Sequence, residues 1–347
     1  MKVPAKINVY RRKLTTFLTS WVGNSPDSNV VKPQKREEIK KILLCRPNHR
    51  LGNQLLISPV IQELTSIFPD ATIDLFVRGT ISKVLLKNYD CIDRIICLPG
   101  KPFKNLFNYF SVWLQLRKCK YDLVLNTTPD SSSGKLSTQF SISKYKCFGN
   151  EEDNLRQVYP DYVHMAKEPV YNIRQFLSNI EKPDKNKPVK PLNLKLSDQE
   201  KSLGKEILNT LVDPGKPTIC IYTFATGDKC YSPTWWSSLY EALVKKYKDY
   251  NIFEMLPKEN VSQIDFKASS YLSGDLREIG AIISNTAVFI GADSGMMHLA
   301  SATGTPVVGL FSVTSIEKYQ PYNAGSVAID TNKTDVKGII EVLDKIL

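Results

Sequence analysis

The stretch FIGADSGMMHLASATGTPVVGLFS, residues 289–312, decides the fold. Two short apolar runs flank a helical pattern over 294–303, and this order predicts a strand, a helix and a second strand. Asp293 or Ser294 is suited to cap the helix, and Gly304 is suited to end it. Because the helix begins at the carboxyl end of a parallel strand, we expect the Asp-Ser-Gly turn at the ligand-binding edge of an open α/β sheet. Free N–H groups at such a helix start attract anions.

The same alternation of short apolar strands and helical patterns runs along the chain from Lys41, and it is typical of parallel βαβ units. In the first half we predict strands at 42–46, 73–77, 94–98 and 123–126, and helices at 106–119 and 164–180. In the second half we predict strands at 218–223, 251–255, 288–291 and 307–311, and helices at 197–211, 235–247, 276–285, 294–303 and 336–347.

A Pro-rich, charged stretch, EKPDKNKPVKP, separates the two halves and is too polar to be a core element. We therefore expect two α/β domains with a cleft between them, where ligands usually bind. The predicted division is an N-terminal segment and linker at 1–36, a first domain at 37–180, the interdomain linker at 181–191, a second domain at 192–332 and a C-terminal helix at 333–347.

Composition and charge exclude several classes of protein. The net charge of +11 is uneven: residues 1–50 carry 12 Lys and Arg against 3 Asp and Glu, whereas the other residues carry 34 against 32. The domains are therefore nearly neutral, which argues against a nucleic-acid groove. The seven cysteines are scattered without a CxxC pair, which argues against a disulfide framework or a zinc site and favours the reduced cytoplasm. We find neither a secretory signal nor an apolar run of roughly 18 residues.

The basic N-terminal segment contains an amphipathic pattern over residues 6–22. Apolar residues recur there at helical spacing, and four basic residues lie beside that stripe or at its edge. A basic amphipathic helix with aromatic residues indicates an anchor on an anionic membrane surface. A helix packed on the body through the same stripe explains the pattern equally well.

A second motif, Thr223-Phe-Ala-Thr226-Gly227-Asp-Lys229, follows the predicted strand at 218–223. A hydroxyl- and glycine-rich turn that ends in a lysine is suited to hold a diphosphate, although on its own it is equally typical of an exposed loop. A third motif, at residues 43–77, runs from a strand through a basic loop and Gly52-Asn53 into an apolar helix. Pro59 lies within that helix, and we expect it to kink the helix.

Taken together, these motifs resemble glycosyltransferase family 9, the heptosyltransferases of lipopolysaccharide core assembly. The resemblance covers roughly residues 40–330 and is strongest at 289–312. It implies a GT-B fold, in which two Rossmann-like domains with parallel sheets face a central cleft: an acceptor domain first and a donor-binding domain second. The matching residues are Arg46, Gly52, Pro59, Phe68, Pro69, Ala71, Asp293, Ser294, Gly295, His298, Leu299, Ala300 and Pro306.

The resemblance also implies roles for residues of the second domain. Asp293 would contact the donor sugar, His298 would support that contact, and Glu259 is a weaker candidate for the ribose. The candidates for the diphosphate and its turn are Thr223, Thr226, Gly227, Lys229, Ser294 and Gly295. We find no Asp-x-Asp pair and no cluster at metal-ligand spacing. We therefore expect neither a metal nor another cofactor, and the departing diphosphate would be stabilised by N–H groups and cations.

One position departs from the family. Asn53 stands where the family has the aspartate that is proposed as general base, and an amide cannot accept a proton. Another group, with His49 and Asp130 as candidates, would replace that base. Alternatively, Asn53 only orients an acceptor that needs no base, or the protein binds the donor without turning it over. Arg46 and Arg50 are expected to face the cleft and meet an anionic acceptor.

We therefore predict an inverting glycosyltransferase that takes a nucleotide-diphosphate sugar, with ADP-heptose as the implied donor. Its acceptor would be an anionic, lipid-linked saccharide such as lipopolysaccharide core, at the cytoplasmic face of the membrane. Two alternatives remain at this point. One is a nucleotide-sugar epimerase or hydrolase of the same fold, and the other is a silent protein that binds a nucleotide sugar or glycolipid.

Overall fold

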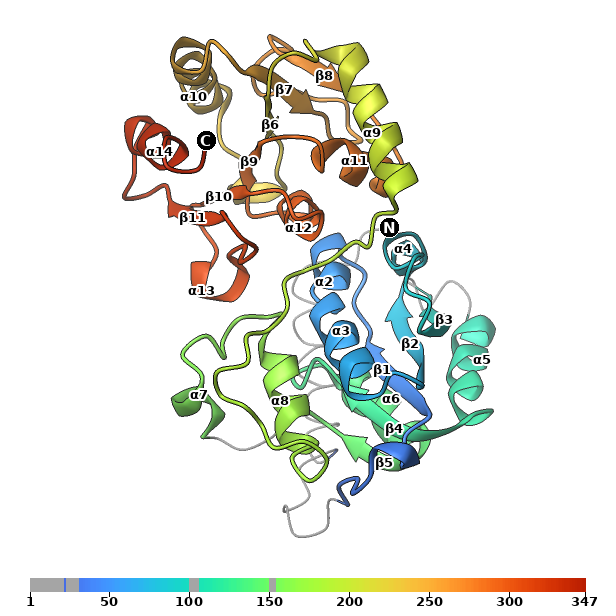
Figure 1. Cartoon of the computed structure of the whole chain (residues 1–347). Coiled ribbons are helices and arrows are strands. Elements are labelled where there is room, and N and C mark those ends of the chain that lie inside the picture. The colour runs from blue at the N-terminus through green and yellow to red at the C-terminus, as the bar shows by residue number, and fades with distance from the viewer. Residues whose placement is uncertain (1–21, 23–30, 100–105, 150–153) are drawn as a thin grey trace.

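The computed structural model describes residue 22 and residues 31–99, 106–149 and 154–347, which form two α/β domains joined by an extended linker (Figure 1). The predicted amphipathic pattern at 6–22 lies outside the described residues apart from Val22, whose side chain is buried. Among the helices that are described, none combines the length and apolar character needed to cross a bilayer.

The first domain is built on a parallel sheet in the order β3-β2-β1-β4-β5. Successive residues of β1 alternate between two cores: Leu43 and Cys45 pack against α5 and α6, while Ile42 and Leu44 face the side of α3 and α8. This alternation explains the continuous apolar run of the strand, because both faces of the sheet are covered. Its strands are β1 (Lys41–Arg46), β2 (Thr72–Arg78), β3 (Ile92–Leu98), β4 (Lys120–Asn126) and β5 (Ile142–Cys147). Its helices are α2 (Leu51–Leu55), α3 (Ser58–Ile67), α4 (Ile81–Leu85), α5 (Leu106–Arg117), α6 (Ser132–Phe140), α7 (Leu155–Val158) and α8 (Glu168–Phe176).

The second domain has a parallel sheet in the order β11-β10-β9-β6-β7-β8. Its strands are β6 (Thr218–Tyr222), β7 (Asn251–Met255), β8 (Ser269–Tyr271), β9 (Val288–Ala292), β10 (Val307–Phe311) and β11 (Val327–Asp330). Its helices are α9 (Asp198–Leu211), α10 (Pro233–Lys246), α11 (Leu276–Ile283), α12 (Gly295–Ala302), α13 (Ile316–Tyr319) and α14 (Val336–Leu343). The C-terminal helix α14 packs beside α10, and its Ile339 and Leu343 enter the core of this domain.

The structure differs from the sequence-based expectations in three respects. Strands β5, β8 and β11, together with α6, were not predicted, and the three strands lie at sheet edges, where half-exposed residues blur the apolar pattern. The helix expected at 164–180 forms only as α8. Pro59 does not kink a continuous helix. It occupies the first turn of α3, after α2 has ended at Leu55, and a proline there removes no hydrogen bond of the helix.

Arg277 connects the two domains by hydrogen bonds on the side of the linker. Its buried guanidinium forms an ion pair with Glu200 and donates to the carbonyl oxygens of Leu194 and Lys195, just after the linker. The same side chain donates to the carbonyl oxygen of Leu85 in the first domain at 3.1 Å. One arginine thus holds the segment just after the linker, α9 and the end of α4 together.

Helix α13 and the residues that follow it connect the two domains on the opposite flank. Met165 donates its backbone N–H to the carbonyl oxygen of Lys318 at 3.1 Å, and His164 Nε2 lies 2.9 Å from the carbonyl oxygen of Gln320. The hydroxyl of Tyr322 donates to the carbonyl oxygen of Lys190 in the linker. The second domain therefore contacts the start of α8 directly.

Candidate active site

Asp293 is the centre of the candidate site in the second domain. It follows β9 at the carboxyl edge of the sheet, and its side chain is buried. Lys229 Nζ lies 3.1 Å from its Oδ2, and the hydroxyl of Thr314 donates to the same oxygen at 2.6 Å. His298 Nε2 lies 3.9 Å from the other carboxylate oxygen. The carboxylate is thus oriented by a cation, a hydroxyl and an imidazole that come from three separate segments.

The turn at Lys229 lies beside this carboxylate because β6 and β9 are neighbours in the sheet. Thr226 and Gly227 are exposed, and Lys229 is half-buried at the end of a short 3-10 turn, Gly227–Lys229. Thr223 lies deeper and is buried. Its hydroxyl donates to the buried carboxylate of Glu254 at 2.6 Å. The side chain of Thr223 therefore points into the domain core and not toward the exposed surface of the turn.

Helix α12 begins at this edge with Ser294 as its N-cap, whose hydroxyl accepts from the N–H of Met297. Ser294 and Gly295 are partly exposed, while His298 is buried one turn further on. Glu259 lies apart from this group in an exposed turn after β7, where its nearest ionic neighbour is Lys258. Burial raises the pKa of Tyr222 at the end of β6, and the Glu259 carboxylate raises it further.

The first domain meets this site through a reciprocal contact between α2 and α12, which face each other across the junction (Figure 1). A Cβ added to Gly52 would lie 2.6 Å from His298 Cδ2, and a Cβ added to Gly295 would lie 2.9 Å from the Cβ of Leu51. Each helix therefore contributes one glycine and one larger side chain. This interlock sets the start of α2, which carries Asn53, against the start of α12.

Asn53 is half-exposed, and within the described part of the chain no hydrogen bond engages its side-chain amide. Its carbonyl oxygen accepts from Arg46 Nε at 2.6 Å, and Arg46 also donates to the carbonyl oxygen of Thr127. The expectation that Arg46 faces the cleft is corrected here. Its side chain is 1% exposed and is buried under α2, where it holds Asn53 through the backbone carbonyl oxygen.

His49 and Arg50 are exposed in the loop before α2, close to Arg78 at the end of β2. Partial burial, with Arg78 and Arg50 nearby, lowers the pKa of His49. The imidazole is therefore a weaker base than a free histidine and lies in a positive field. This loop places exposed cationic groups at the carboxyl edge of the first sheet.

A carboxylate that sequence reasoning missed, Glu168, lies near Arg46 and Asp130. It is half-buried in the first turn of α8, immediately after the segment that contacts the second domain. Burial raises the pKa of Glu168, Asp130 raises it further, and Arg46 opposes the change. Asp130 itself is exposed after β4. The Lys-Glu-Pro sequence at 167–169 is typical of a helix start and was the available signal.

The two buried histidines of the junction are neutral. Burial lowers the pKa of His298 to about 4, and the nearby His164 and Lys229 lower it further against the opposing effect of Asp293. Burial also lowers the pKa of His164 to about 4. Since His164 Nδ1 accepts the N–H of Ala166, its proton is on Nε2 and is donated to the carbonyl oxygen of Gln320. Lys229 is therefore the cation of the donor side, and His298 is a neutral support.

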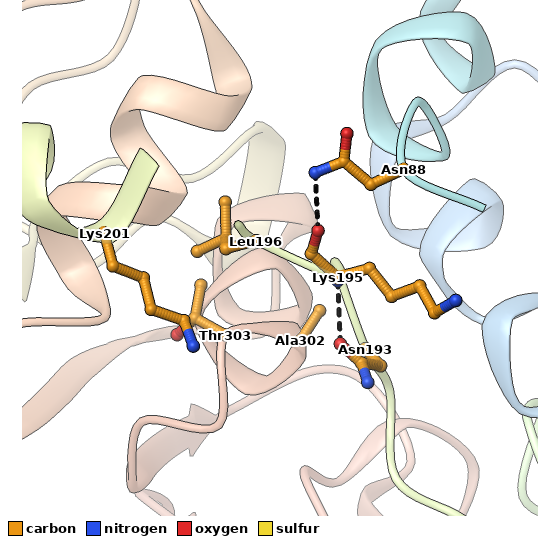
Figure 2. A pocket seen from close by; sticks show the side chains of 7 residues that line it. All are labelled: Asn88, Asn193, Lys195, Leu196, Lys201, Ala302 and Thr303. Carbon is orange, nitrogen blue, oxygen red and sulfur yellow. Dashed lines mark hydrogen bonds between the residues drawn. The ribbon is translucent and has the colours of Figure 1, made fainter. Parts of the chain in front are cut away.

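One pocket among the described residues lies away from this site (Figure 2). It has a volume of about 390 Å³ and lies at the linker, where Asn88 donates to the carbonyl oxygen of Lys195. Ala302 and Thr303, at the end of α12, line it, whereas Asp293 and Ser294 lie at the beginning of that helix. The two places are therefore separated by the helix, which is about 12 Å long. No group of three or more potential metal ligands occurs in the described residues.

Two parallel α/β domains that meet through α2 and α12, with a buried carboxylate and a lysine at the carboxyl edge of the second sheet, have the arrangement of a GT-B fold. A family model described as glycosyltransferase family 9 (heptosyltransferase) matches residues 109–338, more than half of the chain. The chain therefore belongs to glycosyltransferase family 9, which confirms the resemblance drawn from its motifs.

Curated relatives and solved structures agree with this assignment. Lipopolysaccharide heptosyltransferase 3 of Escherichia coli K12 is 24% identical over 304 residues, which cover 78% of this chain and 82% of that protein. Lipopolysaccharide heptosyltransferase 1 of Campylobacter coli is 23% identical over 286 residues, which cover 76% and 82%.

Among solved structures, a family 9 glycosyltransferase from Veillonella parvula superposes with a TM-score of 0.68 at 15% identity, covering 88% of this chain and 97% of that one. The E. coli heptosyltransferase WaaC with ADP gives a TM-score of 0.65 at 13% identity, covering 88% and 100%. These structures confirm the GT-B fold.

Proposed function

We propose that the protein transfers a heptose, with inversion, from an ADP-activated donor to an anionic, lipid-linked saccharide such as lipopolysaccharide core. The single observation that carries this proposal is the Lys229–Asp293 pair at the carboxyl edge of the second sheet, directly opposite α2. The names of the relatives support the heptose and the lipopolysaccharide acceptor. We further propose that the reaction takes place at the cytoplasmic face of the membrane.

On the donor side, the cation of Lys229 and the N–H groups at the start of α12 would bind the diphosphate. Asp293, fixed by Thr314 and supported by the neutral His298, would accept hydrogen bonds from hydroxyls of the donor sugar. Thr226 and Gly227 are exposed beside the lysine and would close the turn over the phosphates. These groups would stabilise the charge that develops on the leaving nucleoside diphosphate, without requiring a metal or another cofactor.

On the acceptor side, we propose Glu168 as the general base that replaces the family's aspartate. The acceptor hydroxyl would lose its proton to the Glu168 carboxylate as its oxygen attacks the anomeric carbon, and the bond from that carbon to the diphosphate would break. A raised pKa makes a carboxylate a better proton acceptor near neutral pH. Asn53 would orient the acceptor through its amide, while Asp130, His49 and Arg50 would form the outer rim.

Replacing the base tests this assignment. Glu168→Gln should lower kcat about 100-fold or more while the KM for the donor stays the same, because a general base contributes about 10²–10⁴-fold. Introducing Asn53→Asp into the Glu168→Gln variant should restore part of the rate, because it returns a carboxylate to the family's position. Asp130→Asn is the matched control for loss of a nearby charge and should change kcat only severalfold. Full activity of Glu168→Gln would reject Glu168 as the base.

A thermal-shift screen over nucleotide sugars tests the donor. A ligand at 100 times its dissociation constant stabilises the protein by about 2.7 kcal/mol. We expect the largest shift with ADP-heptose and a clear loss of that shift in Lys229→Met. An equal shift with every nucleotide diphosphate would show that the sugar is not recognised. Product analysis with and without acceptor then separates transfer from hydrolysis.

A further inference from the structure

Helix α5 presents an apolar stripe to solvent. Its inner side packs on the first sheet through Val112 and Leu116, which are buried. On its outer side, Phe107 is 86% exposed, Phe110 is 63% exposed and Leu114 is 58% exposed. Their spacing of i, i+3 and i+7 puts the three side chains on one face of the helix. In Figure 1 this helix lies on the outer flank of the first domain.

A single exposed apolar residue is ordinary, but three large ones in a stripe on one helix indicate a contact surface. A helix that covers a core on one side normally turns polar side chains outward, and α5 does not. Leaving two phenylalanines and a leucine in water brings no benefit to the fold, because none of the three contributes to the core described here.

The surroundings of the stripe are basic. The described residues from 106 to 121 contain Arg117, Lys118 and Lys120, all exposed, and no Asp or Glu. Of the elements that contact α5, helix α6 carries Lys135 and no acid, and the one acid of β3, Asp93, is paired with basic residues. A partner that complements both features must be apolar at its centre and negatively charged at its surface, as an anionic lipid bilayer is.

The position of α5 is consistent with such a partner. The helix follows β3, so its Phe107 end lies toward the carboxyl edge of the first sheet, the same edge at which β1 leads to Asn53. A bilayer at α5 would therefore lie beside the mouth of the cleft. The significance of this location rests on the proposed function, because a bilayer at α5 would give a lipid-linked acceptor a short path to the site.

We propose that the outer face of α5 docks the protein on an anionic bilayer. Phe107, Phe110 and Leu114 insert among the lipids, and Arg117 and Lys118 contact the headgroups. This surface is made by α5 and contributes to binding in the full chain.

Vesicle co-sedimentation of the full chain tests the proposal. The probes are phosphatidylcholine vesicles with and without about 30% phosphatidylglycerol. We expect the triple variant F107S/F110S/L114S to bind the anionic vesicles at least about tenfold more weakly, because it removes three apolar anchors. The control L203S/F266S alters two similarly exposed apolar residues of the second domain, 53% and 50% exposed, and should bind like the natural chain. Circular dichroism verifies that each variant is folded.

Three outcomes would overturn the proposal. Unchanged vesicle binding of the folded triple variant would show that α5 takes no part. Equal binding of the natural chain to neutral and anionic vesicles would remove the role of the basic residues. A dimer in sedimentation velocity that the triple variant abolishes, without vesicle binding by either form, would assign the stripe to a second copy of the chain.

Transfer to a lipid-free oligosaccharide acceptor separates this proposal from the proposed function. We expect the triple variant to keep that activity, because its substitutions lie outside the cleft. A natural chain that binds anionic vesicles through α5 but transfers no sugar would leave the docking surface in place and reject the proposed reaction.

Discussion

Gly52→Ala tests how the two domains form one site. In α2, an added Cβ would lie 2.6 Å from His298 Cδ2 and 3.4 Å from Cγ of the same ring. Carbon atoms in contact are normally about 3.5–4.0 Å apart, so the overlap is about 1 Å. The ring cannot swing away, because His298 is buried between Asp293 and α2.

The overlap must therefore be relieved by moving α2 away from α12. Since the helices belong to different domains, the shift separates Asn53 from Asp293 by about the same distance. A misplacement of about 1 Å costs on the order of 100-fold in rate, so we expect kcat to fall by about that factor. Overpacking should also reduce the free energy of unfolding by about 1–3 kcal/mol.

The assay is steady-state release of the nucleoside diphosphate, together with chemical unfolding of the same preparations. Gly274→Ala is the matched control, because a Cβ there meets no atom within 4 Å, and it should leave both quantities unchanged. In an His298→Ala background, Gly52→Ala should have little further effect, because the clash is gone. A Gly52→Ala variant with normal kcat would refute the reasoning that domain closure depends on this contact.

Three further predictions concern charge. Arg174→Ala should lower the free energy of unfolding in urea by about 1.5–3 kcal/mol, because the buried carboxylate of Glu63 loses its arginine and keeps only Lys187; a loss below about 0.5 kcal/mol would contradict this. Lys229→Met should lower kcat by about 10²–10³-fold in the same release assay, and near-normal turnover would show that another cation serves the diphosphate of the Asp293 site. As the pH is lowered from 6.5 to 4, the free energy of unfolding should decrease by up to about 3 kcal/mol for each of the buried residues His164 and His298, because their imidazoles take up protons in the unfolded chain but not in the folded one. A free energy of unfolding that stays constant over this range in denaturant titrations would contradict the lowered pKa values.

Residues 289–312 were predictable because each local signal agrees with the fold. β9, α12 and β10 fall within one or two residues of the expected strands and helix, and Ser294 caps the helix as anticipated. The strands are fully buried, so their apolar runs are unbroken. Three edge strands, β5, β8 and β11, carry mixed patterns and were missed, whereas the edge strand β3 was predicted from its apolar end at 94–98.

The site was less predictable, because it depends on contacts between distant segments. A guanidinium at the end of a strand can point into the cleft or lie beneath the next turn, and only the fold shows that Arg46 lies beneath it. Glu168 has no local motif for catalysis. It becomes a candidate only when the start of α8 is brought beside the end of β1 and the segment after α13.

The reciprocal contact between α2 and α12 also limits how this chain can be recombined with its relatives. Each domain presents one glycine to one larger side chain of the other, Gly52 to His298 and Gly295 to Leu51. A hybrid enzyme that takes one domain from another protein must preserve both small–large pairs. Otherwise each domain will fold, but the two helices will clash or leave a gap where the domains pack together. The four positions should therefore be exchanged as a set when donor and acceptor specificities are combined by domain grafting.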